Sequence, residues 1–239
     1  MLRKLLKYDF LTTSKTLLPI YLAMLIITFI FSVMVRINIY DGLIGVLVTS
    51  LFTVALLGSM FTTVLFTVNR FNNGLLKNEG YLSFALPVKT STHIIAKVLN
   101  ALIWGVMELI ALCLAFLIMG LIVGSVKDVA QFFSEILKAF GMIEKEFLLS
   151  FFKVLIIISL EVVSSICMIY CGLAIGHLFD KHQKLIFVLY LVIISVIRST
   201  FMTNLLGANE IVWYIIPIIT ICIYSFITWI ILDRRLNLE

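Results

Sequence analysis

Long uncharged stretches alternate with short charged stretches along the whole chain. Six stretches are predominantly apolar, the third interrupted by Glu108 and the fourth by Glu161: Leu17–Val35, Leu43–Val68, Val98–Gly124, Val154–Gly176, Leu185–Ile197 and Ile211–Leu232. A helix needs about 20 apolar residues to cross the hydrocarbon core of a bilayer, which is about 30 Å thick. Five of the six stretches are long enough. The exception is Leu185–Ile197, which is short. The residues "STFMTNLL" that follow Arg198 either extend this helix or fold back. The pattern predicts six transmembrane helices.

Two further segments have an amphipathic pattern. In residues 1–16, apolar side chains at helical spacing lie opposite three basic ones, namely Leu2, Leu5, Leu6 and Phe10 opposite Arg3, Lys4 and Lys7. This predicts a helix lying on the inner membrane surface, with a plain basic topology anchor as the alternative. After the third span, apolar residues recur at similar intervals: Val129, Phe133, Ile136, Phe140, Ile143 and Phe147. This predicts a second amphipathic helix that lies on the outer leaflet or caps the bundle.

The composition agrees with a membrane protein. Hydrophobic residues make up 62% of the chain and charged residues 13%, whereas soluble domains have about 45–50% apolar and about 25% charged residues. The mean hydropathy is +1.18. The chain has three prolines and no low-complexity tract, so no interdomain linker is expected. We therefore predict an all-α fold, in which residues 1–239 form a single polytopic transmembrane domain.

The basic residues predict the orientation. With the N-terminus inside, twelve Lys and Arg fall on cytoplasmic segments, and six fall on the outer side or within the spans. This asymmetry is the one that the positive-inside rule describes. It predicts a multi-pass protein of the cell membrane with both termini in the cytoplasm. The net charge of +5 is then explained by topology and anionic lipid headgroups, and no nucleic-acid partner is expected.

Sequence motifs for catalysis are absent from the chain. It has no G-x-x-x-x-G-K-[ST], H-E-x-x-H or G-x-S-x-G motif, and its three histidines fall in predicted loops or at helix ends. The four cysteines all fall within predicted spans, where they behave as small apolar residues. Cys167 and Cys171 share a helix face, yet no His or carboxylate stands on the next turn to complete a metal site. We predict neither enzyme activity, nor a cofactor, nor a metal in this chain.

Two acidic residues lie well inside predicted spans. Glu108 is in the third and Glu161 in the fourth. An ionised group there is costly, so each acid is a candidate lining of a substrate path. The alternative is a structural glutamate that packs against Ser, Thr or Asn of a neighbouring helix. Arg198 is the candidate partner of Glu161 if the fourth and fifth spans are adjacent.

The segment "NEGYLSFALPVKTSTHIIAKV", residues 78–98, separates the second and third spans and is unusually apolar for a loop. The segment resembles the cytoplasmic turn of ABC transporter permeases of the six-helix exporter class, ABC type 2. The resemblance consists of an acid, "GYL", an apolar pair, "LP" and a polar start of the next helix. The basic N-terminal segment and the short basic tail after the sixth span also fit. One departure is that the longer external segment follows the third span, whereas the best-described members have it between the last two. The chain therefore resembles a divergent bacterial branch of the class.

The resemblance implies a permease subunit that dimerises with an identical or homologous chain and couples to two copies of a separate ATPase subunit, which bind ATP and Mg²⁺. In this class the turn after the second span docks into a groove of the ATPase. The residues implied in that contact are Lys77, Glu79, Tyr81, Leu82, Phe84, Leu86 and Pro87, with Asp180 and Lys181 of the next inner turn giving a smaller contact. Because the spans offer few polar groups, the expected cargo is an amphipathic peptide or another hydrophobic substrate.

A different role for the loop and two different functions fit the same sequence pattern. The loop aromatics of residues 78–98 would also suit a linker that dips into lipid headgroups. A secondary transporter is the first alternative function, although the two halves of the chain show no matching Gly or Pro interruptions. A membrane sensor or anchor without transport activity is the second. A P-loop ATPase encoded beside this chain would favour the exporter over both.

Overall fold

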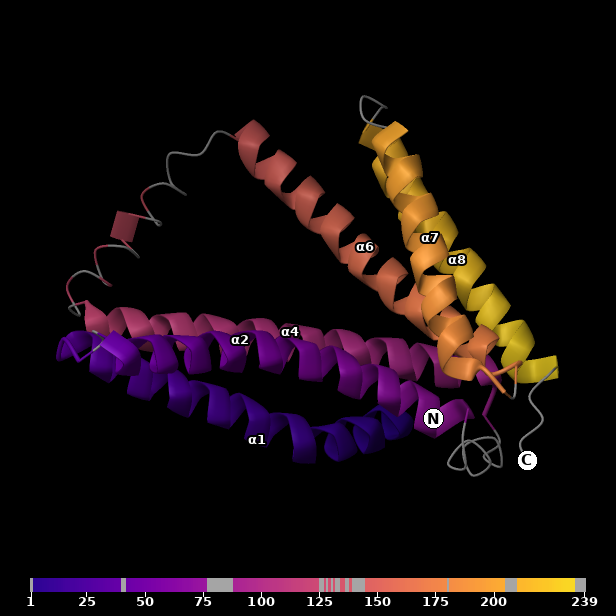
Figure 1. Ribbon diagram of the computed structural model, residues 1–239. Helices are drawn as coiled ribbons and strands as arrows, with labels where there is room; N and C mark the ends of the chain where they lie inside the picture. The colour runs from indigo at the N-terminus through magenta and orange to yellow at the C-terminus, as the bar shows by residue number, and fades with distance from the viewer. Residues whose placement is uncertain are drawn as a thin grey trace. The chain divides into compact units, whose positions relative to one another are not determined.

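The computed structural model describes residues 2–39, 42–76, 88–124, 145–179, 181–204 and 210–234, together with residues 127, 129, 131, 134, 135 and 138. Within these residues the regular structure is all helical, as predicted. Its elements are α1 (Leu2–Arg36), α2 (Gly42–Phe71), η1 (Asn72–Leu76), α4 (Thr90–Val123), α6 (Lys145–Gly176), α7 (Gln183–Asn204) and α8 (Glu210–Arg234) (Figure 1).

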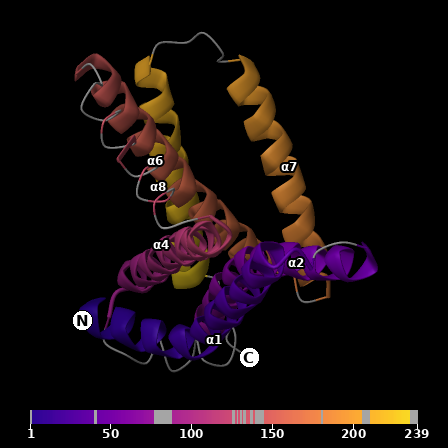
Figure 2. The ribbon, with the colours of Figure 1, turned by 90° about the vertical axis from the view of Figure 1, so that its left-hand side faces the viewer.

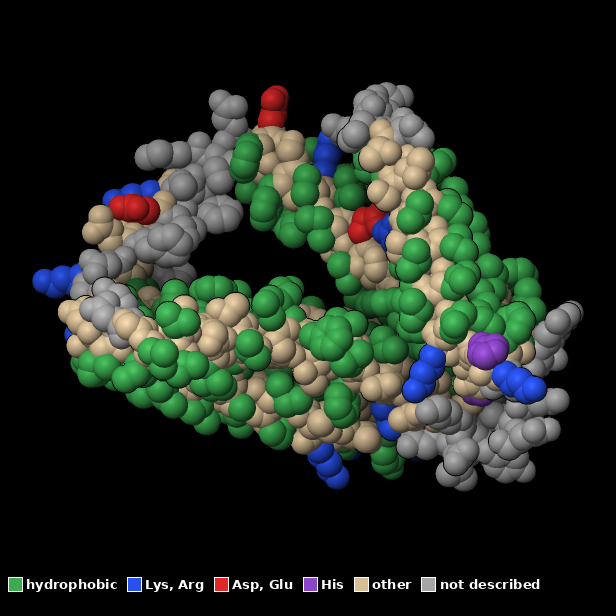
Figure 3. Space-filling view, viewed as in Figure 1, with side chains coloured by type: hydrophobic (Ala, Val, Ile, Leu, Met, Phe, Trp, Pro, Cys, Tyr) green, Lys and Arg blue, Asp and Glu red, His purple; other side chains and the backbone are tan. Residues whose placement is uncertain are grey.

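Among the described residues, six helical segments are long and apolar enough to cross a membrane, and each coincides with one predicted span. The short fifth stretch is extended rather than folded back, because α7 continues past Arg198 to Asn204 and has 22 residues. Figure 3 shows hydrophobic side chains over the lengths of the helices. Such a surface suits contact with lipid tails. The multi-pass architecture predicted from the sequence is thus present.

The N-terminal segment differs from the prediction. We expected a separate interfacial helix before the first span, but residues 2–36 form one continuous helix of 35 residues. At 1.5 Å per residue it is about 52 Å long, which exceeds a hydrocarbon core of about 30 Å. Pro19 lies inside α1, where it removes one backbone hydrogen bond without ending the helix. The change from amphipathic to apolar sequence therefore occurs within α1, without a break in the backbone.

The end of α1 is closed by its own backbone. The amide of Ile39 donates to the carbonyl of Met34, and the amide of Asn38 donates to that of Val35. Asn38 has a φ of 55°, in the left-handed region that Asn tolerates better than most residues. These features form a Schellman motif, which stops the helix and satisfies carbonyls that would otherwise lack donors.

The second span ends in a wide turn. Residues Asn72–Leu76 form the π-helical segment η1, which continues α2 directly. Gly74 lies in this turn, where an added Cβ would be 2.8 Å from the Nζ of Lys97 on α4. Only a glycine lets the lysine side chain approach the backbone so closely. Lys97 itself is buried, as are Leu75 and Leu76.

Contacts divide the chain into two compact units. The α1 unit consists of Tyr8–Thr67 and Leu102–Leu149. In it α1 and most of α2 and α4 lie side by side (Figures 1 and 2). Its core is a cluster of buried residues from these helices, namely Leu17, Tyr21, Met24, Trp104, Ala111 and Ala115. Ala111 and Ala115 are small residues one turn apart, which allow close approach of neighbouring helices.

The α8 unit consists of Met1–Lys7, Val68–Ala101 and Ser150–Glu239. In it α6 contacts both α7 and α8, and the end of α2 and the start of α4 complete the packing. Phe71 of α2 stacks on Tyr170 of α6 with ring centroids 4.1 Å apart and planes 10° apart. The core around this pair is made of Phe71, Leu75, Leu76, Ile94, Ala101, Tyr170 and Leu232.

The predicted external helix falls mainly outside the described residues. Of the six apolar residues that predicted this helix, Val129 and Phe147 are described. Phe147 lies in the first turn of α6 and is exposed, so the last of these residues belongs to the fourth span.

Candidate functional site

A buried carboxyl of α4 is the centre of a polar group in the α1 unit. Glu108 is 5% exposed. Two hydroxyls of α2 contact it: Ser59 Oγ lies 2.9 Å from Oε1, and Thr63 Oγ1 lies 2.8 Å from Oε2. Tyr21 of α1 places its phenol oxygen 2.9 Å from Thr63 Oγ1. Three helices thus hold four polar side chains in one hydrogen-bonded group, Glu108 with Ser59, Thr63 and Tyr21, which we call the Glu108 cluster.

Helical periodicity brings these side chains together. Ser59 and Thr63 are four residues apart on α2 and therefore share a face. Each hydroxyl also reaches a carbonyl of its own helix: Ser59 Oγ is 2.9 Å from Leu56 O, and Thr63 Oγ1 is 3.0 Å from Ser59 O. Hydroxyls in membrane helices are commonly satisfied in this way. Buried residues recur every three or four positions along α1 and form the face to which Tyr21 belongs. They are Asp9, Thr13, Leu17, Tyr21, Met24, Thr28 and Ser32.

An indole lies one helical turn from Glu108 on the same helix. Trp104 is fully buried, stacked on Phe10 with ring centroids 5.0 Å apart and tilted against Tyr21 at 6.2 Å. Within the described residues its Nε1 donates no hydrogen bond. A buried donor without an acceptor is uncommon in native proteins. The packing of Trp104 against Phe10 and Tyr21, beside the Glu108 cluster, therefore leaves one buried N–H without an acceptor among the described residues.

The Glu108 cluster contains no positive charge. Residues 16–35 of α1, 42–69 of α2 and 98–123 of α4 include no Lys, Arg or His, and Glu108 is their sole acidic residue. The hydroxyls of the cluster can donate to the carboxyl but cannot neutralise it. The site thus has the composition of a hydrogen-bonding site for a carboxyl, without the cation that usually accompanies a buried carboxylate.

The second intramembrane acid has a different environment, in the α8 unit. Arg198 Nη2 of α7 forms an ion pair with Glu161 Oε2 of α6, and Arg198 Nη1 donates to Ser165 Oγ at 3.3 Å. This confirms the partner predicted from the sequence. The two side chains are 22% and 26% exposed, so the pair is neither fully buried nor freely solvated.

Most of the predicted ATPase-contact residues lie outside the described part of the chain. They are Lys77, Glu79, Tyr81, Leu82, Phe84, Leu86, Pro87 and Asp180. Lys181 is described, and it is exposed in the turn before α7. The contact predicted for these residues stays a prediction.

The residues on either side of 77–87 are described, and both ends are held. At the first end, Leu75 and Leu76 are buried in the core of the α8 unit. At the second, the hydroxyl of Thr90 at the start of α4 donates to Asp233 Oδ1 of α8 at 3.0 Å. The start of α4 and the end of α8 are therefore at the same end of the α8 unit.

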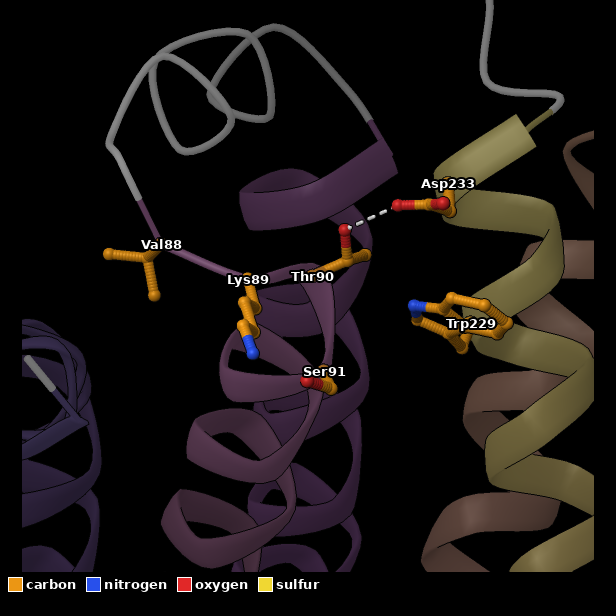
Figure 4. Close-up of a pocket in the computed structure, with 6 residues that line it drawn as sticks. All are labelled: Val88, Lys89, Thr90, Ser91, Trp229 and Asp233. Carbon is orange, nitrogen blue, oxygen red and sulfur yellow. Dashed lines mark hydrogen bonds between the residues drawn. The ribbon is translucent and has the colours of Figure 1, made fainter.

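A recess opens beside this hydrogen bond (Figure 4). Figure 4 shows Thr90 and Asp233 pointing toward one another, and the Trp229 ring extending from α8 toward the helix that carries Ser91. The recess is lined by Val88, Lys89, Thr90, Ser91, Trp229 and Asp233. Its walls thus come from the residues that directly follow 77–87 and from the last turns of α8.

The cysteines are free thiols that pack or face outward. Cys167 and Cys171 are buried, whereas Cys113 and Cys222 are exposed. The hydroxyl of Ser225 on α8 lies 3.7 Å from the sulfur of Cys167 on α6. This agrees with the prediction of lipid-facing and helix-packing cysteines.

Sequence reasoning found both acids but missed the hydroxyls that surround Glu108. A glutamate packed against Ser or Thr was one of the two alternatives for this residue, and the structure identifies the partners as Ser59, Thr63 and Tyr21. The available signal was the pair Ser59 and Thr63 at four-residue spacing, in a helix with several other hydroxyls. No family model, curated protein or solved structure matches the chain.

Proposed function

We propose that this chain is the transmembrane subunit of an ATP-driven exporter, a permease of the ABC type 2 class. Six helices of sufficient length and the resemblance of residues 78–98 to the coupling turn of that class support the proposal. ATP and Mg²⁺ would be bound by two copies of a separate ATPase. A second permease chain, identical or homologous, would complete the transport unit.

The observation that carries the proposal is the way the flanks of 77–87 are held. Leu75 and Leu76 pack into the core of the α8 unit, and Thr90 is bonded to Asp233. Because packed interiors transmit displacement rather than absorb it, a movement of this segment would reach α2, α4 and α8 together. A partner that binds and moves the segment therefore has a mechanical route into the transmembrane helices.

Co-purification with candidate P-loop ATPases, any that is encoded beside this chain first among them, tests the proposal. Replacing Leu82 and Phe84 with Asp is expected to abolish co-purification, because two charges would be placed in a contact that depends on apolar burial. Membrane insertion should be unaffected, since neither residue lies in a span. Unchanged assembly would exclude the contact.

A matched control keeps the apolar character of the same positions. The variant Leu82→Met with Phe84→Leu should still co-purify with the ATPase, because volume-conserving apolar exchanges are usually tolerated. If this control also lost the partner, shape rather than burial would determine the contact. The sensor or anchor alternative predicts no ATPase partner for any of these proteins.

We further propose that both termini are cytoplasmic, as the distribution of Lys and Arg favours. A tag on either terminus should be accessible to a membrane-impermeant label only after the membrane has been opened. Labelling of one tag alone from outside intact cells would overturn the six-span topology, and labelling of both would overturn the proposed orientation.

The proposed cargo is an amphipathic, cationic peptide. Apolar residues dominate the spans, and desolvating each hydroxyl of a sugar would require a hydrogen-bonding partner, of which these helices offer few. The structure changes the relative weight of the two candidate acids. Glu161 is paired with Arg198, whereas the described partners of Glu108 are hydroxyls. Glu108 is therefore the stronger candidate for a charge that a cationic cargo meets.

A further inference from the structure

The recess beside the Thr90–Asp233 hydrogen bond is large enough for a small polar group. It has a volume of about 540 Å³, within the range of roughly 300–1,000 Å³ that is typical of ligand pockets in proteins. Its walls come from the start of α4 and the last turns of α8, which are the ends of two spans. In a bilayer the recess therefore lies where the hydrocarbon core gives way to the polar headgroups.

Two opposite charges line the recess. Lys89 supplies an ammonium group and Asp233 a carboxylate, and Figure 4 shows them on opposite sides of Thr90. Asp233 accepts a hydrogen bond from Thr90 at 3.0 Å, and among the described residues it forms no ion pair with Lys89. A carboxylate has about four acceptor positions, so Asp233 can accept from a further donor. The lining is neutral in sum, with a cation on one side and an anion on the other, and this arrangement complements a zwitterion.

Trp229 adds an aromatic ring that suits the same kind of ligand. It lies four residues before Asp233 on α8, so the two side chains share a helix face, and both line the recess. The face of an indole ring attracts a cation. Trp is also enriched at membrane–water interfaces, because its ring is apolar and its N–H is polar. A ring beside a carboxylate at this depth favours an organic ammonium group.

Exposed apolar side chains continue from the recess along both helices. On α4, Ile95 and Leu99 follow the recess residue Ser91 at four-residue spacing, so the three lie on one exposed face. On α8, the exposed Phe226 is three residues before Trp229 and contacts its ring, with centroids 6.0 Å apart. A ligand with acyl chains can place them against these faces while its polar group occupies the recess. A soluble ion would use the recess alone.

We propose that this recess binds the headgroup of a phosphatidylethanolamine molecule, with the phosphate at Lys89 and the primary ammonium group between Asp233 and Trp229. Both contacts are of the charge-assisted kind, and the acyl chains suit the apolar faces of α4 and α8. A purely anionic headgroup would bring a like charge to Asp233. A choline headgroup has the same charges but no N–H to donate to the carboxylate. The site requires neither an ATPase nor a cargo, so this proposal and the exporter function can fail separately.

Native mass spectrometry of the purified, detergent-solubilised chain tests the proposal. The probe is an equimolar mixture of phosphatidylethanolamine, phosphatidylcholine and phosphatidylglycerol with identical acyl chains. Wild-type protein should retain phosphatidylethanolamine about two- to fivefold more than either other lipid, which is the effect expected of a solvent-exposed charge contact. Glycerophosphoethanolamine, which has the same headgroup without acyl chains, should not compete when added at equal concentration.

Two variants change one charge each. Asp233→Asn keeps an acceptor for Thr90 but removes the negative charge, so the preference should move toward phosphatidylglycerol, because the recess then has a net positive charge. Lys89→Gln should lower the retention of phosphatidylethanolamine about two- to fivefold, since the phosphate loses its cation. Lys184→Gln is the matched control, because Lys184 is an exposed lysine at the start of α7 that does not line the recess. It should retain the lipids as wild type does. The melting temperature without added lipid shows that each variant is folded.

Three outcomes would overturn the proposal. Equal or greater retention of either other lipid by wild type would mean that phosphate and primary ammonium are not recognised together. An unchanged preference in Asp233→Asn and Lys89→Gln, or an equal loss in Lys184→Gln, would place the lipid elsewhere on the chain. Effective competition by glycerophosphoethanolamine would assign the recess to a soluble solute rather than to a membrane lipid.

Discussion

Arg198 of α7 and Glu161 of α6 form an ion pair within the spans, and Ser165 accepts a second hydrogen bond from the same guanidinium. The pair joins two helices that also approach each other closely where Gly172 of α6 lies against the ring of Tyr190 of α7. Because each charge satisfies the other, neither is left alone in an apolar environment. The interaction is therefore a fixed connection between α6 and α7, and removing either partner leaves a charge without its counter-ion.

The first prediction concerns this ion pair. Arg198→Gln should lower the stability of the detergent-solubilised protein by about 1–3 kcal/mol, because Glu161 loses its cation while it stays about three-quarters buried. The melting temperature of the purified protein measures the effect. The double variant Arg198→Gln with Glu161→Gln should be less destabilised than the sum of the two single variants. An additive result would show that the pair does not contribute as a unit.

The second prediction concerns the close contact of α6 with α7. A Cβ at the buried Gly172 would lie 2.6 Å from Cδ1 and 2.9 Å from Cε1 of the Tyr190 ring. Gly172→Ala should therefore cost about 1–3 kcal/mol, since the ring must move to make room. The melting temperature of the purified variant measures this cost.

Gly105 provides the control for Gly172. It lies in α4, and apart from the adjacent residues and the local helix backbone no heavy atom lies within 4 Å of an added Cβ. Gly105→Ala should be neutral or stabilising by up to about 1 kcal/mol, because alanine favours the helix. Equal loss of stability in both variants would contradict a packing origin of the effect.

The fold was largely predictable because it depends on long apolar runs, which can be read directly along the sequence. A run of about 20 uncharged residues has few other stable solutions in a bilayer, so the six helices follow from the sequence. The junction at residues 16–17 could not be placed, because an amphipathic helix and an apolar helix have compatible backbones and join without a turn. The end of α7 was similarly undetermined, since "STFMTNLL" suits either a helix or a turn.

The candidate site was predictable only in part, because a site depends on which helix faces meet. Glu108 and Glu161 were visible as charges in apolar runs, and Arg198 as the candidate partner of Glu161. The hydroxyls of Ser59 and Thr63 were not visible as partners, since many Ser and Thr residues in these helices bond only to their own backbone. The rotation of each helix about its axis decides which polar side chains meet, and the sequence pattern does not determine this rotation in an all-apolar span. The charged residues could therefore be found from the sequence, whereas the hydroxyl partners could not.

The third prediction concerns the hydrogen bond between Thr90 and Asp233. If it helps to pass movement of residues 77–87 to α8, Asp233→Ala should leave the ATPase bound but reduce cargo-stimulated ATP hydrolysis. Thr90→Ala should have the same effect, and the double variant should add little, because both changes remove one interaction. Ser91→Ala, at the next position and without this bond, is the control. Loss of ATPase binding in Asp233→Ala would instead assign the residue to the docking contact.

The fourth prediction concerns the cargo, and it rests on the proposed function. Amphipathic cationic peptides should stimulate ATP hydrolysis by the assembled complex in lipid, and neutral peptides of similar hydrophobicity should stimulate it less. Glu108→Gln should blunt the response to the cationic peptides, because the exchange removes the one acidic group of residues 16–35, 42–69 and 98–123 while keeping the side-chain shape. Basal hydrolysis and melting temperature should be measured in the same preparations.

Glu161→Gln separates a charge effect from a structural one in this experiment. If both acids recognise the cationic peptide, either variant should reduce the stimulation of ATP hydrolysis by that peptide. However, Glu161→Gln also leaves Arg198 without its partner, so its melting temperature should fall whether or not it meets cargo. A response that is lost only together with stability would assign Glu161 to the helix contact alone. If the double variant Glu108→Gln with Glu161→Gln responded to peptides as fully as wild type, both carboxyls would be structural, and the charge argument for a cationic cargo would be wrong.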